Sequence, residues 1–236
     1  MSASSLRQER SATRNALLSG RSSTKDRLIE TGELLYGQNG FSGISLREIA
    51  TMAGQGNCNA VQYHFKNKFG FVSAIMTDRV LRLDALRRQR FEELKSRFPD
   101  GDYAARDLLS VIWGPDLSIV GPNHMHTYIR FSLQYYLQPD AGAHPFYDRD
   151  PQTGWGQVTP LGQSSCLLHA TSLLRSKFAH IRPATFDQRI GLLSMMYQCS
   201  VVEHDNAHAL VSRRKQPPYD FDGVIDMAIG ALSAPD

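Results

Sequence analysis

Apolar residues recur along most of this chain every three or four positions, which is the spacing that places them on one face of an α-helix. The first such pattern predicts a helix over residues 25–39. Gly40 and Phe41 follow directly, and a glycine followed by an apolar residue predicts a Schellman-type helix end. No alternating apolar and polar pattern of a strand competes with these helices, so the sequence predicts an all-α protein.

Two short helices are predicted next, with a glycine-containing turn between them. Ser45 and Glu48 have the spacing of a capping box, which opens a helix at Ser45. This helix is predicted to end at Gly54. Asn57 is then placed to cap a third helix that runs to Phe65. Two short helices joined by a tight turn are typical of a helix-turn-helix.

A long fourth helix follows and connects this region to the remainder of the chain. Asn67 is predicted to cap it, and its apolar positions continue to about Arg97, before Pro99 breaks the pattern. Five more helices are predicted near residues 104–113, 123–137, 162–181, 184–212 and 221–232.

Two segments lack helical periodicity. Residues 1–22 are rich in Ser and Arg and are predicted to form a flexible basic arm. Residues 138–162 are rich in Pro and Gly, and a stretch of that length is typical of a functional loop or a disordered one.

Composition narrows the class of protein. The chain has 236 residues, 42% of them hydrophobic and 21% charged, as in ordinary globular proteins. It has no apolar run of the roughly 18 residues that a membrane helix needs, and its first residues lack the apolar core of a secretory signal. Three widely separated cysteines give neither a disulfide framework nor a metal motif. We therefore expect a cytoplasmic protein with no membrane partner.

The net charge of +3 hides an uneven distribution. Residues 1–100 carry 16 Lys and Arg against 10 Asp and Glu, whereas the remaining residues carry 10 against 13. A basic first part favours binding of a polyanion there, although an uneven solvated surface would give the same pattern.

The third helix carries the side chains that point to a function. Val61 and Phe65 are four residues apart, so both can face the first two helices, while the opposite face is polar and basic. Amide side chains such as Asn59 and Gln62 can pair with adenine in the major groove, and the remaining polar groups can reach phosphates or thymine methyls. The predicted DNA contacts are Ser45, Arg47, Asn57, Asn59, Gln62, Tyr63, His64, Lys66 and Lys68.

Three motifs then resemble the TetR family of transcriptional regulators: RLIETGELLYGQNGF from Arg27, SLREIATMAG from Ser45 and AVQYHFKNK from Ala60. The resemblance covers roughly residues 24–75. It implies a three-helix DNA-binding domain over residues 23–70. It also implies a helical domain over residues 71–236 that dimerises and binds a small effector. Typical members are repressors released from a palindromic operator by that effector, and none of this implies a cofactor.

The chain departs from the family pattern at three places. The turn Gly54-Gln55-Gly56 is one residue longer than the usual form. Gln62 stands where many members have Tyr, and Phe69 stands where many have an acidic residue. These differences bear on individual base contacts rather than on the fold.

The spacing of aromatic and apolar residues predicts two further features, an effector pocket and a dimer interface. Aromatic residues near the predicted helix 123–137 form an effector pocket for a largely apolar molecule or, equally, part of the core. Wide apolar faces on the last two helices form a dimer interface or an intramolecular core, and the interface is favoured because helix-turn-helix proteins usually act as dimers. The pocket candidates are Trp113, His126, Tyr128, Phe131 and Tyr135; the interface candidates are Phe186, Ile190, Leu193, Tyr197, Val201, Phe221, Ile225 and Ala228.

Histidines give an alternative hypothesis, a metal-binding helical sensor or enzyme. His204 and His208 are four residues apart on a predicted helix, a spacing that can chelate zinc. They also fall on the apolar stripe of that helix, which favours core or interface histidines and no metal site. No catalytic triad order, P-loop or dinucleotide motif is present, so the sequence does not predict an enzyme.

Overall fold

The chain is helical, as the sequence predicts, apart from one short antiparallel pairing within the described residues. Strand β1 (Asp148–Arg149) pairs with β2 (Gly156–Gln157) inside the predicted loop 138–162. The flanking parts of that loop, and the predicted arm 1–22, lie outside the described residues. The structure is a computed structural model that describes residues 23–137, 148–149, 156–157, 165–210 and 219–235.

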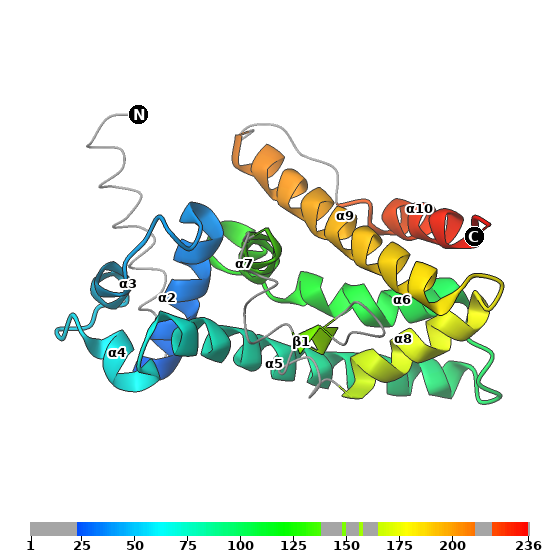
Figure 1. Ribbon diagram of the computed structural model, residues 1–236, viewed down its shortest axis with the longest axis horizontal. Helices are drawn as coiled ribbons and strands as arrows, with labels where there is room; N and C mark the ends of the chain where they lie inside the picture. The colour runs from blue at the N-terminus through cyan, green and yellow to red at the C-terminus, as the bar shows by residue number, and fades with distance from the viewer. Residues whose placement is uncertain (1–22, 138–147, 150–155, 158–164, 211–218, 236) are drawn as a thin grey trace. The chain divides into compact units, whose positions relative to one another are not determined.

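The helices occur in the predicted order, and their ends fall within a few residues of the predicted ones. Two short 3₁₀ helices, η1 and η2, separate α6 from α7 (Figure 1). The elements are α2 (Thr24–Asn39), α3 (Leu46–Met52), α4 (Ala60–Phe65), α5 (Lys68–Arg97), α6 (Ala105–Trp113), η1 (Gly114–Ser118), η2 (Pro122–His124), α7 (Thr127–Tyr136), α8 (Ser165–Lys177), α9 (Pro183–Leu210) and α10 (Phe221–Ser233).

The ends of α2 are set by local hydrogen bonds. At the start, the backbone N–H of Asp26 donates to Ser23 Oγ at 3.1 Å, and the Asp26 carboxylate accepts from the Ser23 N–H at 3.1 Å. At the end, the N–H of Gly40 donates to the Tyr36 carbonyl at 2.9 Å. Gly40 has the positive φ of 68° expected of a glycine stop, but its ψ of 170° is extended. The Schellman-type geometry predicted there is therefore wrong, because that motif needs a left-handed helical ψ.

The chain divides into two compact units that are not continuous in sequence. Unit 1 contains the described residues up to Asp78 together with Val120–Tyr136, and unit 2 contains Arg79–Ile119 and the described residues after Tyr136. The predicted boundary at residue 70 thus lies within α5. Helix α7, predicted to belong to the C-terminal domain, is part of unit 1 instead.

Helix α7 joins unit 1 because it packs along α2. A Cβ atom added at Gly37 would lie only 3.1 Å from Arg130 Cβ and 3.2 Å from the Phe131 backbone nitrogen. The absence of a side chain at Gly37 therefore lets the two helix backbones approach closely.

Aromatic rings complete this contact. The ring of Phe41 lies 5.5 Å from that of Phe131 and 6.2 Å from that of Tyr135, while the ring of Tyr36 lies 4.8 Å from that of Phe41. All four rings are buried. Aromatic burial on this scale is among the largest contributions that a small core can receive.

A polar contact accompanies the aromatic one. The hydroxyl of Thr127 donates to the carboxylate of Glu33, and both residues are buried. Buried carboxylates need such partners because an unpaired one would carry a large desolvation cost. This contact fixes the register of α7 on α2.

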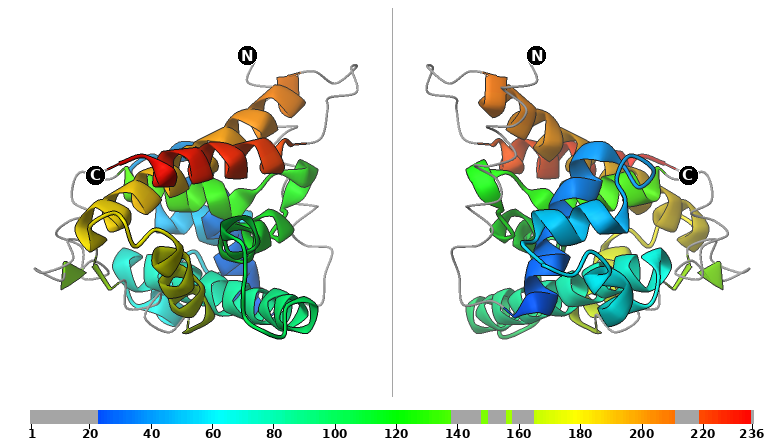
Figure 2. Two further views of the ribbon diagram at one scale, coloured as in Figure 1. Left: turned by 90° about the vertical axis from the view of Figure 1, so that its right-hand side faces the viewer. Right: turned by 90° about the vertical axis from the view of Figure 1, so that its left-hand side faces the viewer.

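Helices α2, α3 and α4 form the rest of unit 1 with the first turns of α5 (Figure 2, right). Their core consists of apolar side chains that the helical spacing places on inward faces. It includes Leu28, Ile29, Ile49, Val61, Phe65, Phe71, Val72 and Ile75.

In unit 2, α6 packs against α8 and α10, and α10 packs against α9. Its buried apolar residues include Leu108, Leu109, Trp113, Leu174, Phe186, Tyr197 and Leu232. No helix among the described residues is long and apolar enough to cross a membrane.

The close approach of α2 and α7 makes Gly37 sensitive to substitution. We expect Gly37→Val to lower the free energy of unfolding by about 1–3 kcal/mol, because the added methyl groups must displace the α7 backbone. Chemical denaturation measures the change. Gly56→Val is the control, since a Cβ there meets no atom within 4 Å, and it should change stability by less than about 0.5 kcal/mol. Equal effects of the two substitutions would contradict the tight contact.

Candidate nucleic-acid interface

Helix α3 begins with the capping box that the sequence predicts. The N–H of Glu48 donates to Ser45 Oγ at 3.2 Å, and the N–H of Ser45 donates to Glu48 Oε2 at 3.0 Å. The Ser45 hydroxyl also donates to the same carboxylate oxygen at 2.9 Å. Ser45, predicted to contact DNA, is thus already used in orienting the first turn of α3. Arg47 in that turn is exposed.

The turn between α3 and α4 differs from the prediction. Gly54 has a φ of 72° and ends α3 where expected. Helix α4, however, begins at Ala60, and its N-cap position is Asn59 rather than Asn57. The side-chain oxygen of Asn57 accepts from the Asn59 N–H at 2.9 Å. Asn57 therefore closes a local turn before the helix, which is the alternative that short amide side chains often adopt.

Helix α4 has two chemically different faces, as predicted. Val61 and Phe65 are buried, and the Phe65 ring lies 4.9 Å from the ring of Phe71 on α5. The opposite face is exposed, and the Tyr63 side chain is 81% accessible. A side chain that exposed contributes little to the core and is accessible to a binding partner. The exposed residues of this face are Asn59, Gln62, Tyr63, His64 and Lys66.

The junction of α4 and α5 is an abrupt turn. Lys66 has a φ of 69°, which is uncommon for a residue with a side chain. Directly after it, the side-chain oxygen of Asn67 accepts from the Gly70 N–H at 2.8 Å. The predicted cap of the long helix is confirmed, and the turn leaves the Lys66 side chain exposed at the end of α4.

Lys68 is used differently from Lys66, although both were predicted to contact phosphates. The ammonium group of Lys68 donates to the Phe41 carbonyl and lies 5.9 Å from the centre of the Tyr36 ring. Lys68 therefore joins α5 to the end of α2. A charge-assisted hydrogen bond and a cation–π contact both favour this position.

The effector-pocket candidates belong to both units. Phe131 and Tyr135 are buried against α2 in unit 1, with Tyr128 also buried and stacked on Phe131 at 6.4 Å. His126 is half-buried in the same unit. Trp113 belongs to unit 2. The candidates on α7 therefore form part of the core, which was the alternative to an effector pocket in the sequence-based interpretation.

The dimer-interface candidates lie on the inner faces of α9 and α10. Six of the eight are buried within the chain itself, and Ile190 and Phe221 are half-buried. The buried six are Phe186, Leu193, Tyr197, Val201, Ile225 and Ala228. They form the core of unit 2 rather than its surface, because the apolar stripe of each helix faces its neighbours in the same chain.

Of the two histidines considered as metal ligands, the structure describes the side chain of His204. His204 is half-buried, with its ring 5.5 Å from the ring of Tyr219, and the His208 side chain lies outside the described residues. Among the residues that are described, no group of three or more His, Cys, Asp or Glu side chains could hold a metal ion.

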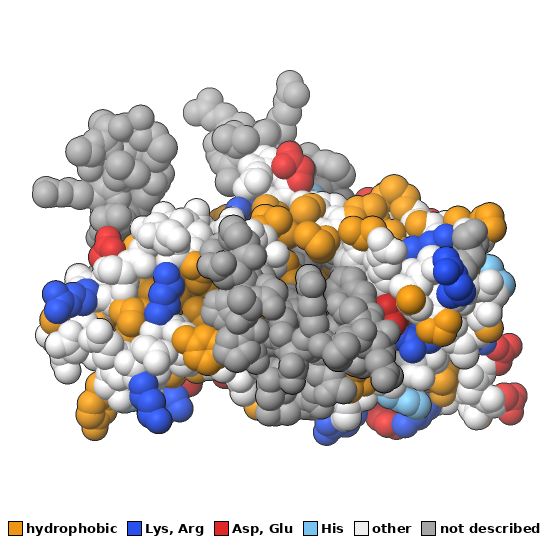
Figure 3. Space-filling view, viewed as in Figure 1, with side chains coloured by type: hydrophobic (Ala, Val, Ile, Leu, Met, Phe, Trp, Pro, Cys, Tyr) orange, Lys and Arg blue, Asp and Glu red, His pale blue; other side chains and the backbone are white. Residues whose placement is uncertain are grey.

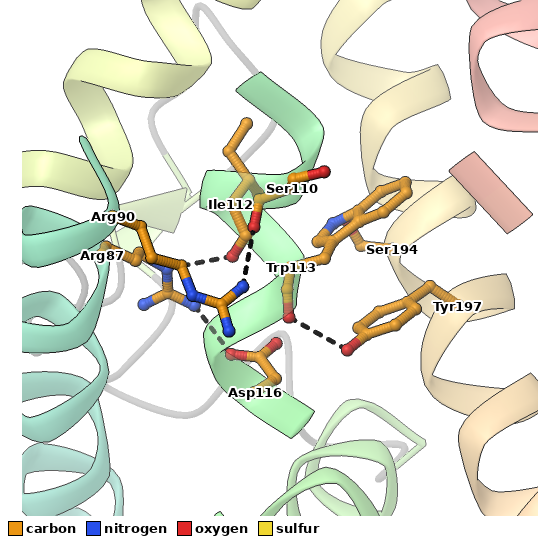
Figure 4. A network of polar contacts seen from close by, with 8 residues as sticks. All are labelled: Arg87, Arg90, Ser110, Ile112, Trp113, Asp116, Ser194 and Tyr197. Carbon is orange, nitrogen blue, oxygen red and sulfur yellow. Dashed lines mark hydrogen bonds and ion pairs between the residues drawn. The ribbon is translucent and has the colours of Figure 1, made fainter. Parts of the chain in front are cut away.

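A buried polar network in unit 2 was missed at the level of sequence (Figure 4). Arg87 of α5 donates to the Ile112 carbonyl at 3.0 Å and to Asp116 at 2.8 Å. Trp113 stacks on Tyr197 at 5.2 Å, and the Tyr197 hydroxyl donates to the Trp113 carbonyl at 3.0 Å. In sequence, Arg87 and Asp116 resemble ordinary surface charges, because only the folded chain places them together.

Comparison with known proteins supports the interpretation of this chain as a transcriptional regulator. No family model matches the chain. The chain is 43% identical over 56 residues to the probable HTH-type transcriptional regulator YttP of Bacillus subtilis (strain 168). This similarity covers 24% of the present chain and 27% of the Bacillus protein. It supports a helix-turn-helix type of transcriptional regulator without defining its family.

The different contacts of Lys66 and Lys68 give a test that needs no DNA. We expect Lys68→Gln to lower the free energy of unfolding by about 1 kcal/mol, because it removes a hydrogen bond from a charged donor. Lys66→Gln, the matched control, should leave stability unchanged within about 0.5 kcal/mol. Thermal and chemical unfolding measure both. A greater loss with Lys66→Gln would show that the two roles are reversed.

Proposed function

We propose that this chain is a homodimeric, sequence-specific DNA-binding transcriptional regulator of the TetR type. In this proposal α3 and α4 are the helix-turn-helix, and α4 is the helix that enters the major groove. The observation that carries the proposal is the exposed polar face of α4, with Tyr63 81% accessible beside exposed amide and basic side chains. This face takes no part in the core of unit 1, and its amide, aromatic and basic side chains suit the edges of base pairs and the phosphates beside them.

The side chains of α4 divide by chemistry into two groups. Asn59 and Gln62 would read bases, since a carboxamide can donate to N7 and accept from N6 of adenine or pair with other edges. Tyr63, His64 and Lys66 would contact phosphates or thymine methyls. Arg47 would hold a phosphate near the start of α3. Because Lys68 is bonded to Phe41, its role would be to fix α5 rather than to contact DNA.

Charge and similarity both support this assignment. The first hundred residues carry an excess of six basic residues, which favours a polyanion. The relative from Bacillus is named a probable HTH-type transcriptional regulator. A cytoplasmic protein that acts on double-stranded DNA, and not an enzyme, is consistent with both.

Selection of duplexes from a random DNA pool tests the proposal. We expect a palindromic site whose half-sites lie roughly 34–36 Å apart, one helical turn of DNA. Gln62→Ala and Tyr63→Ala should each weaken binding of the selected duplex roughly 5- to 150-fold, because each removes a contact worth about 1–3 kcal/mol. Gln38→Ala, an exposed glutamine of α2, is the control and should bind like the wild type. Wild-type binding by both α4 variants would show that α4 is not the reading helix.

The proposed dimer needs a surface on the outer sides of α9 and α10, since their inner sides form the core. Leu192 of α9 is 60% exposed, and Met227 of α10 is 57% exposed. Figure 3 shows apolar side chains gathered over these two helices in the upper right of the view. A palindromic operator requires two recognition helices related by a twofold axis, so an isologous contact of these helices is the arrangement proposed.

Charge placed on this surface should separate the subunits. We expect the double substitution Leu192→Asp with Met227→Asp to convert a dimer into a monomer, because two carboxylates on each subunit would be buried without partners. Light scattering after gel filtration measures the mass. Leu168→Asp changes a residue of α8 that is 55% exposed and serves as the control, which should remain dimeric. A dimer that survives the double substitution would place the interface elsewhere.

The proposed mode of action is repression relieved by a small, largely apolar effector. The effector would bind in unit 2, to which Trp113 belongs, and α7 would contribute through its packing rather than as a pocket wall. Such a molecule can act only if its affinity differs between the DNA-binding state and the released state.

A further inference from the structure

The buried ion pair between Arg87 and Asp116 occupies a special place along the chain. Asp116 lies in η1, and four residues later, at Val120, the chain passes from unit 2 into unit 1. Arg87 lies on α5, which itself passes from unit 1 into unit 2 after Asp78. The pair therefore joins two of the segments that connect the units, close in sequence to both points of passage.

The bonds of Arg87 hold these two segments together. Its Nη2 donates to Asp116 Oδ1 at 2.8 Å, and its Nε donates to the Ile112 carbonyl at 3.0 Å (Figure 4). Both members of the pair are buried. A charge-assisted hydrogen bond is roughly twice as strong as a neutral one, and loss of either charge leaves the other buried without compensation.

Three groups act on the Asp116 carboxylate from the helices packed around it. Arg87 and Arg90 of α5 are cationic and favour its charged form, and Tyr197 of α9 lies close enough to interact with it. Tyr197 stays neutral, since burial raises the pKa of its hydroxyl far above the ordinary value and the hydroxyl donates to the Trp113 carbonyl at 3.0 Å.

We propose that the Arg87–Asp116 pair is a proton-sensitive latch, in which protonation of Asp116 weakens the attachment of η1 to α5 and thereby weakens operator binding by unit 1. The coupling rests on the proposed DNA-binding function. With the latch closed, the segment that leads into α7 is tied to α5, and α7 packs on α2 in the unit that carries α4. With the latch open, cationic Arg87 faces a neutral carboxylic acid, so the ion pair is lost and the remaining hydrogen bond holds η1 to α5 more weakly.

The latch titrates in a useful range. Burial raises the pKa of Asp116 to about 6, against the opposing effect of Arg87 and Arg90. The carboxylate is therefore charged and paired at pH 7.5, and most of it is protonated at pH 5. A fall in pH of one or two units below neutrality opens the latch.

Tryptophan fluorescence tests the latch without DNA. In a Trp155→Phe background, Trp113 is the remaining tryptophan, three residues before Asp116 and stacked on Tyr197. We expect its emission to change with pH around a midpoint near 6, and Asp116→Asn to abolish that change. Asp102→Asn, which removes an exposed partner of Lys177, is the control and should retain the midpoint. A transition that persists in Asp116→Asn would overturn the latch.

A second variant keeps the test valid if Asp116→Asn does not fold. Arg90 is half-buried and donates only a 3.4 Å hydrogen bond to the Ser110 carbonyl. Because its positive charge favours ionised Asp116, Arg90→Gln should move the midpoint to higher pH. An unchanged or lower midpoint would contradict the assignment of the transition to Asp116.

Operator binding then tests the coupling, with the duplex selected from the random pool as the probe. At pH 7.5 we expect Asp116→Asn to bind about fivefold or more weakly than the wild type, a typical coupling between sites, and the difference to vanish at pH 5. Taking the ratio of the two proteins at each pH cancels every effect of pH that the two proteins share. A ratio that does not change with pH would overturn the coupling. If no duplex is selected while the fluorescence transition behaves as expected, the proposed function fails and the titrating latch remains.

Discussion

The packing of α7 along α2 is the contact on which the organisation of this chain depends. Gly37 allows the two backbones to approach, and the rings of Tyr36, Phe41 and Phe131 fill the space beside them. Because α7 comes more than eighty residues after α2, this contact draws a distant segment into the unit that holds α3 and α4. The chain must then pass between the two units more than once.

The exposed face of α4 results from the small number of apolar side chains that this helix buries. Val61 and Phe65 are the anchors that bury one side of this six-residue helix. The other side then presents Gln62 and Tyr63 to solvent, as the helical period requires. So short a helix has little stability of its own, so its orientation is set by the two anchors, by the cap at Asn67 and by the bond from Lys68 to Phe41. The base-reading role proposed for α4 would need this kind of fixed support, because its side chains would have to meet the groove in one register.

The core of unit 2 contains buried charged side chains at positions where apolar side chains would be expected. Arg87 and Asp116 are buried together, although a buried ion pair contributes little to stability once desolvation is counted. Such a pair instead connects two specific segments, here α5 and η1, and the connection depends on both side chains being charged. In sequence, the pair lies between the part of α5 that leaves unit 1 and the segment that leads into α7.

Local sequence patterns predicted the helices, their order and the two faces of α4. These features depend on residues close in sequence, such as Ser45 with Glu48, or Val61 with Phe65. The same patterns misplaced Asn57, since the same amide side chain can cap a helix or close a turn just before one. Which apolar faces meet is visible only in the folded chain, where Phe131 and Tyr135 pack beside the end of α2 and the inner residues of α9 and α10 form the core of their own chain. The folded chain also pairs Arg87 with Asp116. Contacts between residues far apart in sequence depend on which helices lie beside each other, and helical periodicity shows that a face is buried without showing against what.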